Sequence, residues 1–135
     1  MLKILVVDDS DIFRRTFMDF LKERFPSYES EEARNGNEAI IKTKEFSPDL
    51  IFLDVKLPGA SGLELAREIK ITNPDIAIVI VTNYDLPEYR DKAKENGADL
   101  FLSKTSLSEE RIVNFIETVI TECHSCTTQD VRKPL

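Results

Sequence analysis

Four short, continuous apolar runs constrain the fold of this chain more than any other feature. They lie at residues 4–7, 50–53, 76–81 and 100–102. Runs of Ile, Val, Leu and Phe without alternation are typical of strands that are buried on both faces, as in a parallel sheet. A fifth segment, residues 28–33, contains three glutamates. We expect it to be an edge strand, where charge discourages edge-to-edge pairing.

Helical patterns lie between these strands. A helix is predicted over residues 11–25, because its apolar residues share one face and Ser10 can cap its N-terminus. Further helices are predicted over residues 37–46, 62–71, 86–96 and from 107 onward. Asp85 is expected to cap the fourth helix, and Ser106 with Glu109 to form a capping box at the fifth. This βα order, repeated five times, predicts a three-layer α/β sandwich around a parallel sheet.

Composition narrows the class of protein. A chain of 135 residues with a net charge of -7 fits one domain without general affinity for nucleic acid or anionic lipid. No apolar run reaches the length of a membrane span, the start of the chain does not resemble a signal peptide, and two cysteines supply no disulfide framework. We therefore expect a cytoplasmic protein that contacts neither nucleic acid nor membrane directly.

The last fifteen residues differ in character from the rest of the chain. Residues 1–120 are expected to form the domain, and residues 121–135 a flexible tail or the start of a linker in a longer protein. This tail contains Cys123, His124 and Cys126. A closed zinc site needs four ligands in a supporting fold, so incidental thiols are the favoured interpretation of this segment.

Polar residues stand where the predicted strands end. Asp8 and Asp9 follow the first strand, Asp54 the third, Thr82 the fourth and Lys104 the fifth. Doubly wound sheets bind ligands just beyond the carboxyl ends of their strands. We therefore expect these residues, distant in sequence, to meet at one rim of the sheet.

The residue types at this rim indicate phosphoryl transfer. Three carboxylates packed together repel one another unless a cation is present. Oxygen ligands without nearby His or Cys favour a hard divalent ion such as Mg²⁺. A carboxylate can act as a nucleophile and form an acyl phosphate. Mg²⁺, the Lys104 ammonium and the Thr82 hydroxyl could together neutralise and position the phosphoryl oxygens.

Over residues 2–120 the chain resembles the receiver domain of response regulators. The family motifs occur in order: Asp8-Asp9, Asp54-x-x-Leu57-Pro58-x-x-Ser61-Gly62, Thr82, Gly97-Ala98 and Lys104. A single acidic pair or lysine would be a weak signal, whereas this ordered set is specific. The resemblance implies a flavodoxin-like, doubly wound (βα)5 fold whose five-stranded parallel sheet has the order 2-1-3-4-5.

The resemblance also implies the roles of the acidic residues. Asp54 would accept the phosphoryl group, and Asp9 and Asp54 would bind Mg²⁺ directly. Asp8 would act through water, and Lys56 would contribute only its backbone carbonyl. The donor would be a sensor histidine kinase or a histidine phosphotransfer domain.

Signalling would follow from a second set of residues. The resemblance makes Lys104 the counter-ion of the phosphoryl group, Thr82 the switch hydroxyl and Phe101 the aromatic that moves inward with it. The fourth helix, fifth strand and fifth helix would form the output face for a downstream protein or output domain, and a phosphorylation-dependent homodimer is possible. Such a module would catalyse its own phosphorylation and dephosphorylation without acting on a separate metabolite.

The chain departs from the family pattern at several positions. Asn83 and Thr105 stand where the family usually has a small residue and a proline, and Lys56 and Tyr84 flank the site where access of water and phosphodonor is set.

An enzyme of the haloacid-dehalogenase kind would carry a second Asp where Lys56 stands. A flavodoxin would need a phosphate-binding loop rich in Ser, Thr and Gly after the first strand. A third alternative, a degenerate receiver that only binds partners, remains because of Asn83.

Overall fold

The computed structural model describes residues 2–122 and has one five-stranded parallel sheet at its centre. Its strands are β1 (Leu2–Val7), β2 (Tyr28–Ala33), β3 (Leu50–Leu53), β6 (Ala77–Thr82) and β7 (Leu100–Ser103). Their order is β2-β1-β3-β6-β7, and every neighbouring pair is parallel. Because β4 and β5 lie outside this sheet, the order is the predicted 2-1-3-4-5, and the (βα)5 fold is confirmed.

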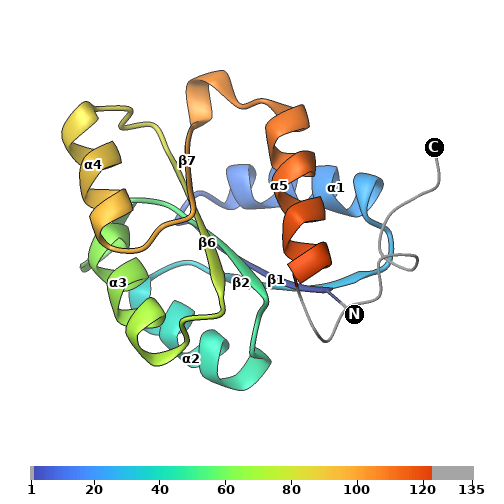
Figure 1. Cartoon of the computed structure of the whole chain (residues 1–135), viewed down its shortest axis with the longest axis horizontal. Helices are drawn as coiled ribbons and strands as arrows, with labels where there is room; N and C mark the ends of the chain where they lie inside the picture. Colours follow the sequence, from blue (N-terminus) through green and yellow to red (C-terminus); the bar gives the residue numbers. More distant parts are fainter. Residues whose placement is uncertain (1, 123–135) are drawn as a thin grey trace.

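Five helices cover the two faces of the sheet (Figure 1). They are α1 (Asp11–Arg24), α2 (Gly36–Phe46), α3 (Gly62–Thr72), α4 (Pro87–Glu95) and α5 (Glu109–Glu122). One buried cluster joins α1 and α5 to the sheet, and a second joins α2, α3 and α4 to it. The protein is therefore the three-layer sandwich expected from the alternation of strands and helices.

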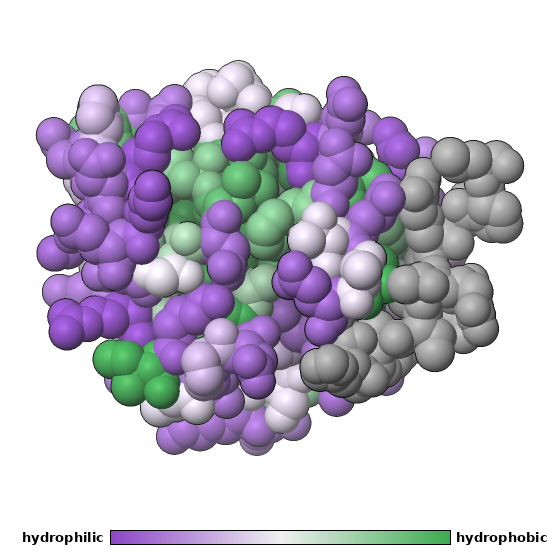
Figure 2. Space-filling view, in the orientation of Figure 1, coloured by the Kyte–Doolittle hydropathy of each residue, from purple (hydrophilic) through white to green (hydrophobic). Residues whose placement is uncertain are grey.

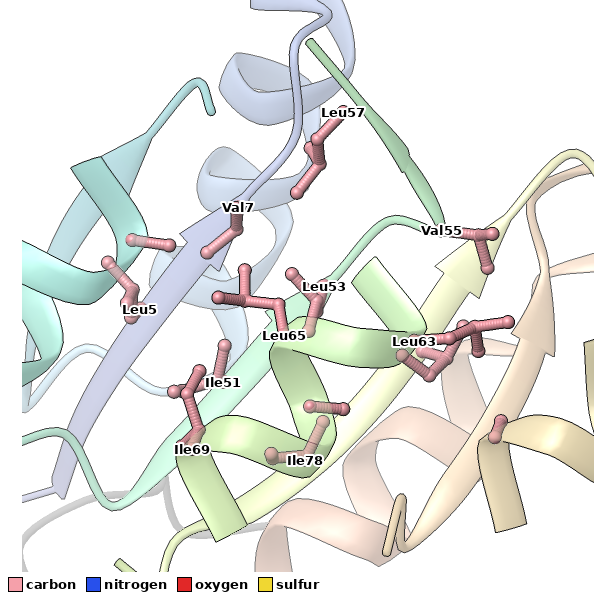
Figure 3. Packing of buried hydrophobic residues seen from close by; sticks show 14 of the residues in the cluster. Leu5, Val7, Ile51, Leu53, Val55, Leu57, Leu63, Leu65, Ile69 and Ile78 are labelled. Atoms are coloured by element: carbon pink, nitrogen blue, oxygen red, sulfur yellow. The ribbon is translucent and has the colours of Figure 1, made fainter. Parts of the chain in front are cut away.

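Successive residues of the central strands enter opposite cores. In β3, Leu50 and Phe52 belong to the cluster under α1 and α5, whereas Ile51 and Leu53 belong to the other. Figure 3 shows Ile51 and Leu53 packed near side chains of α3 in this second cluster. Because both faces are covered, these strands are apolar apart from Lys3 in β1 and the last residues of β6 and β7, which is why their sequence shows no alternation. The acidic β2 lies at the sheet edge, as predicted.

The predicted N-cap of the first helix is confirmed. The Ser10 hydroxyl accepts a hydrogen bond from the Phe13 N–H at 3.2 Å and caps α1. Gly97 follows α4 with a φ of 93°, a left-handed conformation that glycine adopts without steric cost. The second helix begins at Gly36, one residue before the predicted start, because Asn35 caps it through the N–H of Glu38 at 2.9 Å.

Two predicted caps are wrong. Proline is favoured at the first helical position, so Pro87 makes Leu86 the N-cap of α4, and Asp85 instead forms an ion pair with Arg90. Ser106 ends a short 3₁₀ turn, Lys104–Ser106. The cap of α5 is Ser108, whose hydroxyl accepts from the Arg111 N–H at 3.2 Å. The capping box therefore does not form.

A small hairpin connects β3 to α3. Its strands are β4 (Lys56–Leu57) and β5 (Ala60–Ser61), which pair antiparallel around the predicted Pro58-Gly59 turn. Gly62 follows this hairpin and donates its N–H to the Val55 carbonyl at 2.6 Å. A Cβ at Gly62 would lie 1.8 Å from the carbonyl oxygen of Asp54. The backbone next to Asp54 can therefore take this path only with glycine at position 62.

Two further findings bear on the sequence predictions. No helix within residues 2–122 is long and apolar enough to span a membrane. The predicted flexible tail began at residue 121, but residues 121 and 122 are the last of α5. The rest of it, with Cys123, His124 and Cys126, lies outside the described residues. The domain boundary at residue 120 stays a prediction.

We expect Gly62→Ala to lower the free energy of unfolding by about 2–3 kcal/mol or more, because its methyl group would overlap the Asp54 carbonyl. Gly59→Ala is the matched control. Gly59 has a φ of 71° but nothing within 4 Å of an added Cβ, so only backbone strain of about 1–2 kcal/mol applies. Urea denaturation measures both changes. Equal losses in the two variants would contradict the overlap at Gly62.

Candidate functional site

The carboxyl ends of four adjacent strands meet at one rim of the sheet. Asp8 follows β1, Asp54 follows β3, Thr82 ends β6 and Lys104 follows β7. The parallel register pairs Val7 with Leu53, so the two aspartates that follow them emerge side by side. The topology thus brings together residues that lie up to 96 positions apart in the sequence (104 − 8).

Three carboxylates and one ammonium form the centre of this rim. Asp8, Asp9 and Asp54 each offer an oxygen, and these atoms lie within 4.8 Å of one another. Asp8 is 1% exposed and Asp54 7% exposed, whereas Asp9 is open to solvent. Lys104 Nζ lies 2.6 Å from Asp8 Oδ2 and 3.2 Å from Asp54 Oδ2. One cation therefore faces three anions.

Burial and ion pairing act against each other in this cluster. Burial raises the pKa of Asp8, although hydrogen bonds from Lys104 and from the Ser10 N–H partly offset the rise. Burial also disfavours the charged form of Lys104, but its contacts with Asp8 and Asp54 outweigh that effect and raise its pKa. The lysine is therefore protonated at neutral pH and bridges the two buried carboxylates.

The cluster fits a hard divalent cation. Asp54 Oδ1 is buried and has no hydrogen-bond partner, the only such side-chain atom among residues 2–122. Most buried polar atoms are paired, so an orphaned carboxylate oxygen beside two further carboxylates indicates a place for a cation. All-oxygen ligands match Mg²⁺. Lys56 follows Asp54 by two residues, at the start of β4, and its carbonyl as a ligand stays a prediction.

Thr82 and Phe101 belong to the neighbouring strands β6 and β7. Thr82 is fully buried, and its hydroxyl accepts a hydrogen bond from the Tyr84 N–H at 3.2 Å. Phe101 is 8% exposed and packs in the cluster under α2, α3 and α4. The Arg90 guanidinium lies over its ring, 4.9 Å from the centroid. This contact connects α4 to β7 and has no signal in the sequence.

The residues that depart from the family pattern are exposed and follow β3, β6 and β7 in the chain. Asn83 and Tyr84 are exposed, and Lys56 Nζ lies 4.7 Å from the centre of the Tyr84 ring. Thr105 belongs to the 3₁₀ turn after β7, where its N–H donates to the Ser103 hydroxyl at 3.3 Å. No peptide bond within the described part of the chain is cis.

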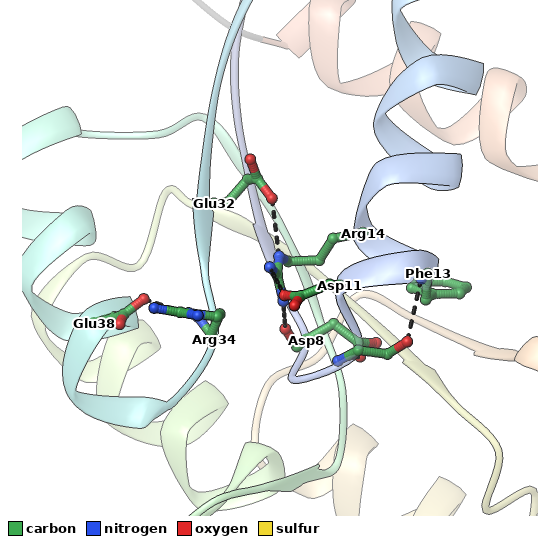
Figure 4. A network of polar contacts seen from close by, with 8 residues as sticks. Asp8, Asp11, Phe13, Arg14, Glu32, Arg34 and Glu38 are labelled. Atoms are coloured by element: carbon green, nitrogen blue, oxygen red, sulfur yellow. Dashed lines mark hydrogen bonds and ion pairs between the residues drawn. The ribbon is translucent and has the colours of Figure 1, made fainter.

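Arg14 supports the site from behind and was missed in the sequence. It is 6% exposed, and one guanidinium nitrogen donates to the backbone carbonyl of Asp8 at 2.6 Å. Its Nε donates to Glu32 at 2.9 Å, and it also pairs with Asp11 (Figure 4). The available signal was its position, three residues before the buried Phe17 on the apolar face of α1. A buried charge on that face requires ionic or hydrogen-bonding partners.

Comparison with known protein sequences identifies a family. The model of the response regulator receiver domain matches residues 4–117. The chain is 33% identical to the chemotaxis protein CheY of Halobacterium salinarum, over 88% of this chain and 97% of that protein. It is also 33% identical to the transcriptional regulatory protein LnrK of Bacillus subtilis, but there it spans only 54% of the relative's length.

Solved structures agree with this family. A CheY-like receiver domain protein from Methanospirillum hungatei has a TM-score of 0.80 at 25% identity, over 88% of this chain and 94% of that chain. The response regulator TrrA of Thermotoga maritima, solved with Mg²⁺ and BeF, has a TM-score of 0.77 at 34% identity, over 88% and 99% of the two chains. The chain belongs to the response regulator receiver domain family of two-component signalling.

Proposed function

We propose that Asp54 accepts a phosphoryl group in a Mg²⁺-dependent reaction, with a sensor histidine kinase or histidine phosphotransfer protein as donor. The observation that carries the proposal is the arrangement around Asp54. One of its oxygens is bonded to the Lys104 ammonium, and the other is buried and unpaired beside Asp8 and Asp9. A nucleophile and its counter-charges are thus assembled before a donor arrives.

The transfer forms one bond and breaks one. An Asp54 oxygen bonds to phosphorus as the bond from phosphorus to the donor histidine nitrogen breaks. Bound Mg²⁺, held by Asp9, Asp54 and the Lys56 carbonyl and by Asp8 through water, would supply the charge that neutralises the phosphoryl oxygens. Lys104, already 3.2 Å from Asp54 Oδ2, donates a charged hydrogen bond to one of those oxygens.

Switching would follow from the new charge on Asp54. The Thr82 hydroxyl gives up the hydrogen bond that it accepts from the Tyr84 N–H and donates one to a phosphoryl oxygen. Phe101 then moves into the space that the hydroxyl has left. The affected surface comprises α4, β7 and α5. Figure 2 supports this choice, because an apolar surface lies between polar flanks where β7 runs between α4 and α5 in Figure 1. An apolar region of this kind suits a protein partner.

In this proposal the protein is a cytoplasmic signalling module. Its only chemistry would be the phosphorylation and dephosphorylation of its own Asp54. Its net charge of -7 opposes direct binding to nucleic acid or membrane. The output would pass through a downstream protein, an attached output domain or a phosphorylation-dependent homodimer. The match to nearly the whole length of a chemotaxis protein supports the first route, and the half-length match to a transcriptional regulator supports the second.

Phosphorylation is tested with acetyl phosphate as a small donor. Incubation with Mg²⁺ should add one phosphoryl group to the parent protein and none to Asp54→Asn, because the amide is not a nucleophile. EDTA should abolish the gain. Intact-mass spectrometry reads the result, with Asp91→Asn as a control that removes an exposed carboxylate of α4. A phosphorylated Asp54→Asn variant would place the acceptor elsewhere.

Metal binding is tested by stability. Without Mg²⁺, Asp54→Asn should be more stable than the parent by about 1 kcal/mol, because it removes one charge from a cluster of three anions and one cation. Mg²⁺ at about 100 times its Kd should stabilise the parent by about 2.7 kcal/mol. The variant should gain much less, and Asp91→Asn as much as the parent. Equal gains in parent and Asp54→Asn, measured by urea denaturation, would contradict metal binding at Asp54.

The switch is tested with beryllofluoride, a mimic of the phosphoryl group. In the parent, beryllofluoride with Mg²⁺ should shift amide NMR signals both around Asp54 and along α4, β7 and α5. Thr82→Ala should keep the shifts around Asp54 and lose most of those on the distant surface, because the hydroxyl that couples them is absent. Undiminished distant shifts in Thr82→Ala would exclude Thr82 as the coupling residue.

A further inference from the structure

We propose that Phe13 is a positioning residue for Lys104, and that its ring holds the ammonium beside Asp54 through a cation–π contact. The proposal rests on the proposed function, in which Lys104 neutralises the phosphoryl group. Lys104 Nζ lies 4.3 Å from the centre of the Phe13 ring. The sequence pattern identified Phe13 only as part of the apolar face of α1.

The ring completes the surroundings of the ammonium. The Lys104 side chain is 10% exposed, and its other two neighbours are Asp8 Oδ2 at 2.6 Å and Asp54 Oδ2 at 3.2 Å. A cation within about 6 Å of an aromatic centroid is attracted to the ring face, most strongly where water is excluded. The Phe13 ring does not accept strong hydrogen bonds as a carboxylate does. The N–H groups of Lys104 therefore stay available for the phosphoryl oxygens on Asp54.

The Phe13 ring is itself fixed by an aromatic stack. Its centroid lies 5.5 Å from that of Phe17, with the planes 18° apart. Phe17 meets Phe52 edge-on at 4.7 Å and 67°. Phe52 belongs to β3 and precedes Asp54 by two residues. The stack therefore connects the ring under Lys104 to the same strand that carries the phosphoryl acceptor, and it fixes their relative position.

The backbone of α1 adds a second connection. The Ser10 hydroxyl accepts from the Phe13 N–H at 3.2 Å, and the Ser10 N–H donates to Asp8 Oδ1 at 2.9 Å. Phe13 is thus tied at its backbone to the carboxylate that Lys104 contacts and at its ring to the core. A lysine has four flexible side-chain bonds, so a rigid neighbour reduces the positions that its ammonium can sample.

Phe20 provides a matched control on the same helix. Its ring is also half-buried and lies 6.1 Å from that of Phe17, but the cation near it is Arg24, at 6.0 Å, which pairs with Glu109 away from the carboxylates. If Phe13 acted only as a core residue, replacing either aromatic by leucine would have the same effect on the site.

The experiment compares Phe13→Leu, Phe13→Tyr and Phe20→Leu with the parent by two readouts. The first is the rate of phosphoryl uptake from acetyl phosphate at saturating Mg²⁺, followed by intact mass. The second is the NMR shift of the Lys104 side-chain methylene protons in the unphosphorylated protein, which the ring current moves upfield. We expect Phe13→Leu to lower the rate about three- to tenfold and to remove the upfield shift. Phe13→Tyr should retain both, and Phe20→Leu should keep the parental rate and shift.

The two readouts separate the possible failures. A parental rate in Phe13→Leu would overturn the positioning role, and an unchanged Lys104 shift would overturn the contact. An equal rate loss in Phe20→Leu would assign the effect to core packing. If the parent itself takes up no phosphoryl group while Asp54 is accessible, the proposed function is wrong and the role of Phe13 falls with it. Denaturation of each variant shows that the comparison is made on folded protein.

Discussion

The Lys104 ammonium between Asp8 and Asp54 is the interaction on which this site depends. Without a cation between them, two carboxylates buried at the end of a parallel sheet would repel each other. The free-energy cost of removing their charges from water would also be uncompensated. One lysine neutralises them only in part, because Asp9 adds a third charge within 4.8 Å. The resting site therefore retains unbalanced negative charge and an unpaired Asp54 oxygen, both of which a cation can relieve.

The fold explains why this charge collects at one place. Both faces of the sheet are covered by helices, so the central strands are apolar apart from Lys3, and their other polar residues appear where the strands end. Parallel register then aligns those ends. Gly62 contributes to the same geometry, since a side chain there would displace the Asp54 backbone. Core packing and the position of the acceptor are thus parts of one structural constraint.

The sequence predicted what depends on local pattern and topology. Apolar runs gave the strands, and the strand ends gave Asp8, Asp54 and Lys104, which the structure brings together. It could not give contacts between residues distant in the chain, such as the hydrogen bond from Arg14 to Glu32 or the Lys104 ammonium over the Phe13 ring. Caps failed where two adjacent signals competed, because Pro87 and the 3₁₀ turn after β7 moved the helix starts by one or two residues.

The strength of the contacts around Phe101 bears on the proposed switch. The Phe101 ring is covered by the Arg90 guanidinium, and Arg90 is held by Asp85 in an ion pair whose side chains are 50% and 42% exposed. Exposed ion pairs contribute about 0–1 kcal/mol, and exposed cation–π contacts about 0.5–1 kcal/mol. These two contacts over the Phe101 ring are therefore weak, and its packing in the buried cluster with α4 is the larger contribution to its position. In the proposed switch, a single new hydrogen bond from Thr82 to a charged phosphoryl oxygen, of about 1.5–3 kcal/mol, is large enough to offset the loss of these two exposed contacts, so Arg90 can leave the ring while Phe101 stays in the core.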